Sequence, residues 1–350
     1  MSHAVVRPSR RMRVRLLIGV AASLIALQCA PAIARAEWQS GVNFRDYTPA
    51  SYGAPAADTS LARVAADKNT HVAIVTTWYT PNLTSSTIAP DPNRTPSDAA
   101  VLHAMAQARA DGLQAVLKPH VDSNTGDWRG YITASDPDAW FASYTRMIDH
   151  YADLATQGGA SMLVIGTELK GMSGSANTAR WQGLIADVRH RFAGKLVYAA
   201  NYNEFQGVKF WNRLDYIGVD AYFPLASASD PSLADLLTAW TSRGYVNSLH
   251  TIATNYNRKV LFTEVGYRSE PDTATHPFQW SGAPAIDLLA QSTAYEAAYE
   301  TFAGQPWFAG MYWWYWPPVL PADGGMDPEY RPIDKPAETV MQTWNALMNP

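Results

Sequence analysis

Short apolar runs alternate with longer amphipathic segments along the chain from residue 40 onward. Nearly every position in the runs is apolar, as in parallel strands that are buried on both faces. The eight runs lie at residues 40–44, 71–79, 113–121, 161–169, 195–202, 214–223, 259–267 and 308–316. The amphipathic segments at 95–112, 136–159, 178–194 and 283–304 have the pattern of helices. In the first of these, Ser97 is a plausible N-cap and Gly112 a plausible stop.

Eight strands separated by helices predict an α/β fold, a (β/α)8 TIM barrel that forms a single catalytic domain over residues 37–350. A doubly wound open sheet is the alternative. Its dinucleotide-binding form carries a Gly-rich turn after the first strand, and the residues at 40–47, Ser-Gly-Val-Asn-Phe-Arg-Asp-Tyr, do not form such a turn. In a barrel, the active site is expected at the C-terminal ends of the strands.

Residues 1–36 have the pattern of a signal peptide. Five arginines from Arg7 to Arg15 precede an apolar stretch at 16–30, and Ala-Arg-Ala at 34–36 suits cleavage before Glu37. The apolar stretch is too short to anchor the protein stably in a membrane once the signal is removed. The only cysteine, Cys29, lies in this segment, so the mature protein should need no disulfide. We therefore expect an exported protein, periplasmic or extracellular.

Charge and composition narrow the classes of partner. The net charge is −4, and no basic stripe follows the N-terminal segment, so nucleic acid is not an expected partner. The chain has 13 Trp and 18 Tyr. These aromatic residues fit either a large core or a surface that stacks on sugar rings, and composition alone does not decide between the two.

Two of the predicted strands end on Thr-Glu. The fourth run closes with Leu-Val-Ile-Gly-Thr-Glu at 163–168, and the seventh contains Leu-Phe-Thr-Glu at 261–264. The fourth and seventh strands stand on opposite sides of a barrel mouth, so Glu168 and Glu264 can flank one glycosidic bond. One glutamate then donates a proton to the leaving oxygen while the other attacks the anomeric carbon. The alternative for each is a surface residue or a member of a structural ion pair.

Four segments at the predicted strands are distinctive: Gly-Val-Asn-Phe at 41–44, Lys-Pro-His at 118–120, Ile-Gly-Thr-Glu-Leu at 165–169 and Phe-Thr-Glu-Val-Gly-Tyr at 262–267. Together they resemble glycoside hydrolase family 113, a clan-A family of endo-β-1,4-mannanases. The resemblance covers residues 38–344 and implies Glu168 as general acid/base and Glu264 as nucleophile of a retaining double displacement. Most clan members place Asn directly before the acid/base. This chain has Thr167 there, so the contact that Asn makes with the sugar 2-hydroxyl must come from elsewhere.

Further residues at the strand ends are candidates for substrate binding. They are Asn43, Trp78, His120, Asn201, Tyr222, Trp313 and Trp314. The clan resemblance assigns Tyr222 to a hydrogen bond with the nucleophile. Alternation along the last strand favours Trp314 as the sugar platform, with Trp313 as the alternative. Asn43 and Asn201 are plausible readers of sugar hydroxyls, and His120 could bond a hydroxyl or the acid/base, or be a satisfied histidine of the barrel mouth.

Charged residues on the predicted third and sixth strands add two further expectations. Alternation puts Lys118, His120 and Asp122 on one face of the third strand. If that face points inward, Lys118 is buried and needs an acidic partner. Asp220 could hold either Arg45 or Lys118.

The expected function is that of a retaining glycoside hydrolase acting on a β-linked polysaccharide or oligosaccharide. Endo-β-1,4-mannan is favoured by the resemblance alone, and galactan, xylan, glucan or an exopolysaccharide are alternatives. A non-catalytic carbohydrate-binding barrel would keep the tryptophans but would not need both glutamates. The sequence has neither the clustered histidines of a metal-dependent hydrolase nor a nucleophile elbow. The expected chemistry requires no metal and no organic cofactor.

Overall fold

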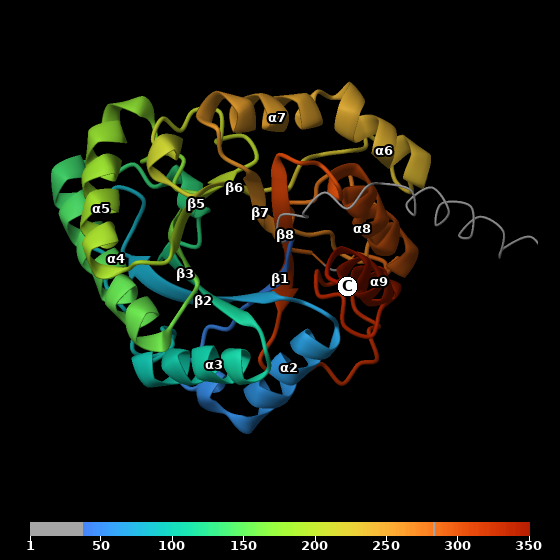
Figure 1. Ribbon diagram of the computed structural model, residues 1–350, viewed down its shortest axis with the longest axis horizontal. Coiled ribbons are helices and arrows are strands. Elements are labelled where there is room, and N and C mark those ends of the chain that lie inside the picture. Colours follow the sequence, from blue (N-terminus) through green and yellow to red (C-terminus); the bar gives the residue numbers. More distant parts are fainter. Residues whose placement is uncertain (1–37, 283) are drawn as a thin grey trace, which may run out of the picture. The chain divides into compact units, whose positions relative to one another are not determined.

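Eight parallel strands form a closed barrel in the order β1 to β8, with β8 paired to β1. The computed structural model describes residues 38–282 and 284–350. Seen along the barrel, the strands form a ring enclosed by helices (Figure 1). The predicted single-domain (β/α)8 barrel is confirmed.

The helices and strands have the following bounds. The strands are β1 (Gln39–Phe44), β2 (His71–Thr80), β3 (Gln114–Ser123), β4 (Met162–Thr167), β5 (Lys195–Asn201), β6 (Tyr216–Asp220), β7 (Val260–Val265) and β8 (Phe308–Trp316). The helices are α2 (Pro55–Ala66), α3 (Asp98–Ala110), α4 (Pro137–Gly158), α5 (Thr178–Arg191), α6 (Leu233–Ser242), α7 (Tyr245–Tyr256), α8 (Leu288–Phe302) and α9 (Pro336–Met348). Short 3-10 turns are η2 (Ser51–Gly53), η3 (Arg129–Tyr131), η4 (Ser175–Asn177) and η5 (Trp211–Arg213).

The start and stop signals of the first predicted helix are present in α3. The Ser97 side chain accepts a hydrogen bond from the backbone N–H of Ala100, as an N-cap does. The helix ends at Ala110, and Gly112 follows with a φ of +84°. The helix predicted at 283–304 is shorter, because Asp287 caps α8 at its N-terminus; residue 283 lies outside the described residues.

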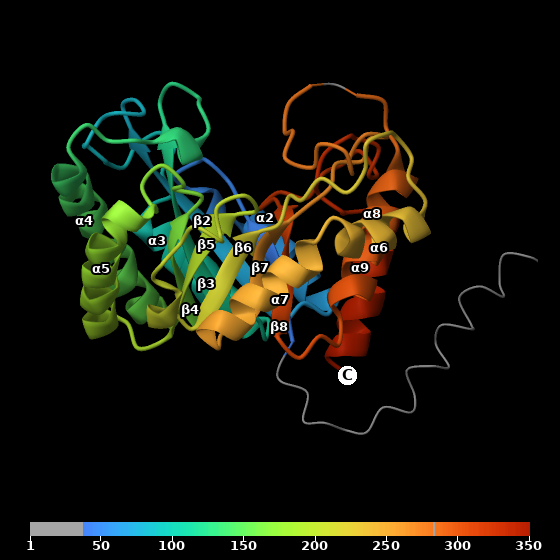
Figure 2. The same cartoon turned by 90° about the horizontal axis from the view of Figure 1, so that it is seen from above.

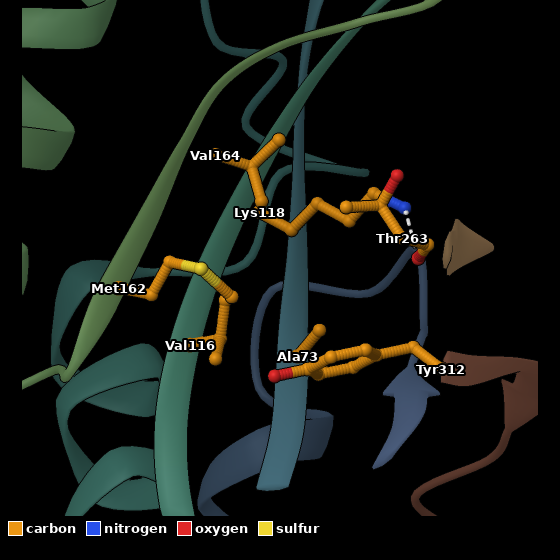
Figure 3. Close-up of a pocket in the computed structure, with 7 residues that line it drawn as sticks. All are labelled: Ala73, Val116, Lys118, Met162, Val164, Thr263 and Tyr312. Carbon is orange, nitrogen blue, oxygen red and sulfur yellow. Dashed lines mark hydrogen bonds between the residues drawn. The ribbon is translucent and has the colours of Figure 1, made fainter. Parts of the chain in front are cut away.

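Small and apolar side chains fill the interior of the barrel. They include Ala73, Val116, Met162, Val164, Leu261 and Tyr312, and the space between them has no room for a water molecule. Tyr312 fits because Gly41 faces its ring; an added Cβ would lie 2.5 Å from that ring. Figure 3 shows Lys118 crossing this interior towards Thr263. The packed interior is therefore the floor beneath the polar strand ends.

Both glutamate-bearing strands contain an irregularity just before the glutamate. Between β4 and β5, Val164 pairs with Val197 and Thr167 with Ala199, so β4 has one extra residue. Between β6 and β7, Val219 pairs with Phe262 and Asp220 with Glu264, so β7 also has one extra residue. Such bulges redirect the side chains that follow them. The two Thr-Glu ends are therefore placed by bulges and not by simple alternation.

The predicted signal peptide at residues 1–36 lies outside the described residues and stays a prediction. Within the part of the chain that the structure describes, no helix has the length and apolar character needed to cross a membrane.

Replacing Gly166 by Ala should destabilise the protein. An added Cβ would lie 2.7 Å from the Tyr198 ring, and Tyr198 is fully buried. Overpacking of this kind costs about 1–3 kcal/mol of unfolding free energy, which urea denaturation measures. Gly183→Ala is the matched control. That glycine lies within α5 with nothing within 4 Å of an added Cβ, so the control should gain about 0.5–1 kcal/mol. Equal effects of the two changes would contradict this account.

Candidate active site

Glu168 and Glu264 both lie buried at the C-terminal end of the barrel. Glu168 directly follows β4 and is 8% exposed, while Glu264 lies in β7 and is 4% exposed. The loops that follow β3 and β7 rise at this same end (Figure 2). Two carboxylates in one buried region need different surroundings if one is to hold a proton and the other a charge.

Glu264 is surrounded by donors that favour its charged form. Lys118 Nζ donates to Glu264 Oε1 at 2.6 Å, and the Tyr222 hydroxyl donates to Oε2 at 2.7 Å. Burial raises the pKa of Tyr222 well above its usual range, so the phenol keeps the proton that it donates. The contact expected between Tyr222 and the Glu on the seventh strand is therefore present in the structure.

Lys118 points into the barrel and is fully buried, so it needs an acidic partner, and it has two, Glu264 and Asp220. Its ammonium also donates to Thr263 O at 3.0 Å and lies 3.7 Å from Asp220 Oδ1. Of the two cations considered for Asp220, the structure selects Lys118. The Thr263 hydroxyl donates to Asp220 at 2.7 Å. Burial, and next the charge of Glu264, raises the pKa of Asp220 well above its usual range.

Glu168 is surrounded mainly by neutral donors. Trp128 Nε1 donates to Oε2 at 2.9 Å, and Asn201 Nδ2 donates to Oε1 at 2.5 Å. Arg129 Nη1 is 4.0 Å from Oε2. Burial, and next the charge of Glu264, raises the pKa of Glu168, while Arg129, Trp128 and Asn201 oppose the rise. Glu168 therefore keeps a proton to higher pH than an ordinary glutamate, as a proton donor must.

Three of the predicted substrate-binding residues, Asn43, Trp78 and Trp313, have their side chains engaged by other parts of the protein. Asn43 is fully buried; its Nδ2 donates to Thr263 O at 3.1 Å and its Oδ1 accepts from Lys118 at 3.2 Å, so the amide is used within the protein. Trp78 packs outward against His150 and Tyr151 of α4.

Trp313, the alternative platform, also faces the helices. Its ring stacks on Tyr295 with the centroids 3.5 Å apart, and its Nε1 donates to the Tyr299 hydroxyl at 2.8 Å. Pairing of β8 with β1 shifts register between Val42 and Phe44, so Trp316 also packs outside, where its Nε1 donates to Ser60.

Trp314 lies at the barrel mouth, half-buried, beside His120. The two rings stack with centroids 6.2 Å apart and an interplanar angle of 15°. Burial lowers the pKa of His120 well below its usual range, so the imidazole is neutral. Neither ring nitrogen has a hydrogen-bond partner among the described residues, and Nε2 is 3.8 Å from Glu264 Oε1. Trp314 and His120 thus offer a flat apolar face and a free polar group next to Glu264.

The loop after β3 supplies two contacts to Glu168 that the sequence analysis did not predict. Trp128, which directly precedes η3, reaches Glu168. Arg129 pairs with Asp122 at 2.7 Å and adds positive charge near Glu168. No periodic pattern marks these two residues, because loop side chains follow neither strand nor helix spacing. The nearby Asp122, at the end of β3, was the one signal that a cation should lie close.

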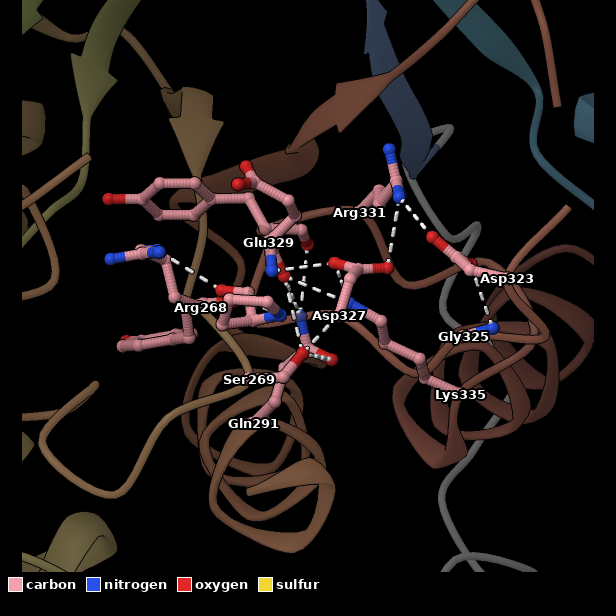
Figure 4. Close-up of polar contacts among 12 residues, drawn as sticks. Arg268, Ser269, Gln291, Asp323, Gly325, Asp327, Glu329, Arg331 and Lys335 are labelled. Atoms are coloured by element: carbon pink, nitrogen blue, oxygen red, sulfur yellow. Dashed lines mark hydrogen bonds and ion pairs between the residues drawn. The ribbon is translucent and has the colours of Figure 1, made fainter. Parts of the chain in front are cut away.

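The long loops after β7 and β8 are tied to each other by buried polar contacts (Figure 4). Lys335 Nζ donates to Ser269 Oγ and to Asp327 Oδ1, both at 2.9 Å. In the loop after β8, the Tyr330 ring meets the Tyr222 ring edge-on, with the ring centroids 6.3 Å apart. The loops therefore support the phenol that bonds Glu264.

Within residues 38–282 and 284–350, no group of three or more His, Cys, Asp or Glu side chains is arranged to hold a metal ion.

Comparison with known proteins identifies the family. Residues 45–334 match the sequence profile of glycoside hydrolase family 113. The chain belongs to glycoside hydrolase family 113. It is therefore a glycoside hydrolase, and the family resemblance of its sequence is confirmed. No curated protein sequence matches the chain.

Solved structures of family 113 enzymes share the fold over nearly their whole length. The β-mannanase from Alicyclobacillus acidocaldarius, solved in complex with ManMIm, is 27% identical with a TM-score of 0.81, covering 89% of this chain and 98% of that one. A second family 113 β-1,4-mannanase is 25% identical with a TM-score of 0.81, covering 89% of this chain and 99% of the other.

Replacing Trp128 by Phe should move the alkaline limb of the kcat/KM profile to higher pH. The indole N–H stabilises the charged form of Glu168, so its loss raises the pKa of that group further. The alkaline limb reports loss of the general acid's proton in the free enzyme, and Glu168 is our candidate for that acid, so initial rates across pH measure the shift.

The matched control for this change is Trp344→Phe. Trp344 Nε1 donates to Glu296 Oε2 at 3.1 Å in the outer helix layer, so its removal should leave the profile in place. An alkaline limb that stays put or moves to lower pH in the Trp128 variant would contradict the assigned hydrogen bond.

Proposed function

We propose that this enzyme hydrolyses β-1,4-mannan within the chain and with retention of anomeric configuration. The observation that carries the proposal is the pair of buried glutamates with unlike surroundings. Glu264 faces an ammonium and a phenol, and Glu168 faces neutral N–H donors. The choice of mannan is supported by the likeness to the family 113 β-mannanases across most of the chain.

In the first step, Glu264 is the nucleophile and Glu168 the acid. A Glu264 carboxylate oxygen attacks the anomeric carbon, and the bond from that carbon to the glycosidic oxygen breaks. Glu168 transfers its proton to the departing oxygen. The product is an ester between the sugar and Glu264, and Glu168 is left ionised. Lys118 and Tyr222 hold the carboxylate of Glu264 in its charged form before attack.

In the second step, Glu168 acts as the base. Its carboxylate takes a proton from water, and the water oxygen attacks the anomeric carbon as the ester bond to Glu264 breaks. Both glutamates return to their starting states. Two inversions at one carbon give net retention. Trp314, half-buried beside His120, is our candidate for the platform on which a sugar ring next to Glu264 stacks through its C–H groups.

A panel of polysaccharides tests the substrate. Reducing-sugar release should be fastest on unsubstituted β-1,4-mannan and far slower on galactan, xylan, mixed-linkage glucan and bacterial exopolysaccharide. Internal cleavage should lower the viscosity of the mannan solution early, before much reducing sugar accumulates. Preference for another glycan would overturn the mannan assignment while leaving the hydrolytic mechanism standing.

Azide rescue tests the two carboxylate roles. Glu264→Ala should lose about 10⁴-fold or more in kcat. Azide should then restore part of the turnover of an activated aryl glycoside and give the glycosyl azide of inverted configuration. Glu168→Ala with azide should give the azide of retained configuration, because the covalent intermediate still forms. Product configuration is read by NMR, and the same configuration from both variants would rule out the assigned roles.

A further inference from the structure

Glu204 is a buried carboxylate behind Glu168 that takes no part in either step above. It follows β5 and is 5% exposed. Three donors converge on it. The hydroxyls of Ser173 and Tyr198 donate to Oε1, each at 2.6 Å, and the backbone N–H of Asn201 donates to Oε2 at 2.9 Å.

Two of these donors also reach Glu168 or its neighbour. The Asn201 side chain donates to Glu168 Oε1, while the Asn201 backbone is held by Glu204. The Tyr198 hydroxyl accepts from the backbone N–H of Leu169, the residue after Glu168, at 3.0 Å. Glu204 is therefore connected to the Glu168 side chain through one partner and to its backbone through the other.

The backbone at Glu168 makes such support necessary. Glu168 has a φ of +53°, in the left-handed region that non-glycine residues rarely adopt. Such a conformation persists only where surrounding contacts fix it. Its own N–H donates to Ala199 O at 2.7 Å, and the next N–H depends on Tyr198. Tyr198 in turn occupies the space that Gly166 leaves open.

We propose that Glu204 is a positioning residue that fixes Glu168 for proton transfer, acting through Asn201 and Tyr198. This inference rests on the proposed role of Glu168 as acid/base. An ionised carboxylate suits the position because it accepts at both oxygens and donates at neither. A glutamine there would turn its N–H₂ group either towards the Asn201 N–H, which would lose that contact, or towards the two hydroxyls, which would then have to accept instead of donate.

The test compares substrates that need the acid with substrates that do not. Glu204→Gln should lower kcat/KM about 10- to 100-fold for a β-linked oligosaccharide, since general acid catalysis contributes about 10²–10⁴-fold in total. For the 2,4-dinitrophenyl glycoside of the same sugar, kcat/KM should change less than about twofold, because dinitrophenolate leaves without a proton. Burial raises the pKa of Glu204 to about 7. Rates are therefore compared at the alkaline end of the active range, where Glu204 is ionised in the wild-type enzyme.

A matched control separates positioning from general destabilisation. Glu338 is also 5% exposed and accepts from Arg63 and from the backbone N–H of Asp334, in contacts that do not involve the glutamate pair. Glu338→Gln should lower the free energy of unfolding without any dependence on the leaving group. Tyr198→Phe should show the same leaving-group dependence as Glu204→Gln but to a smaller degree. Its effect should be less than additive with that of Glu204→Gln, because both act on one network.

The outcomes are distinct. Equal losses on the two substrates, or no loss on either, would overturn the positioning role. If Glu204→Gln does not fold by circular dichroism, Ser173→Ala provides the same comparison, because it removes one donor and leaves the carboxylate in place. Glu168→Ala is the reference: if it lacks the leaving-group dependence, the proposed acid/base is wrong, whatever Glu204 does. The aryl glycoside is built on whichever sugar the wild-type enzyme releases, so a wrong substrate assignment does not affect the result.

Discussion

Two carboxylates buried at one barrel mouth repel each other when both are ionised, and the site is arranged around that repulsion. Near a protein surface, two unit charges 4 Å apart interact by about 4 kcal/mol, enough to keep one group protonated. The surroundings decide which group that is. Glu264 has the ammonium of Lys118 at 2.6 Å, whereas the cation nearest Glu168, Arg129, is 4.0 Å away and is shared with Asp122. The proton therefore belongs on Glu168.

The difference between the surroundings of Glu168 and Glu264 depends on parts of the fold that carry no catalytic group. Lys118 reaches Glu264 because its chain crosses above a filled apolar interior. Tyr312 fills that interior only because Gly41 leaves it space. The bulges in β4 and β7 turn each glutamate towards the mouth at the point where the strand ends. Small changes of packing far below the mouth should therefore reach the chemistry.

The sequence predicts the parts of this structure that depend on local pattern. The eight apolar runs, the N-cap at Ser97 and the repeated Thr-Glu ends are each written in neighbouring residues. Trp78 and Trp313 were misplaced because alternation gives only which residues share a face, and the inward face must be known separately. Asn43 was proposed as a reader of sugar hydroxyls, but its amide bonds to groups of β3 and β7, and such pairings are not visible along the chain. The contacts of Trp128 and Glu204 were not predicted because they too join residues that are distant in the sequence or lie in loops.

The residue before Glu168 helps to explain why the Glu168 side chain is held by contacts from other strands. Where most of the clan has Asn, this chain has Thr167, which is 1% exposed and whose hydroxyl has no hydrogen-bond partner among the described residues. The amide beside Glu168 comes instead from Asn201, at the end of the next strand. Because this amide comes from a different strand, its position depends on how firmly the end of that strand is fixed. Here Glu204 fixes it by accepting a hydrogen bond from the backbone N–H of Asn201. A buried carboxylate is costly to stability unless its partners are complete. The presence of the buried carboxylate of Glu204 is better explained by the geometry that it fixes at Glu168 than by any contribution to folding.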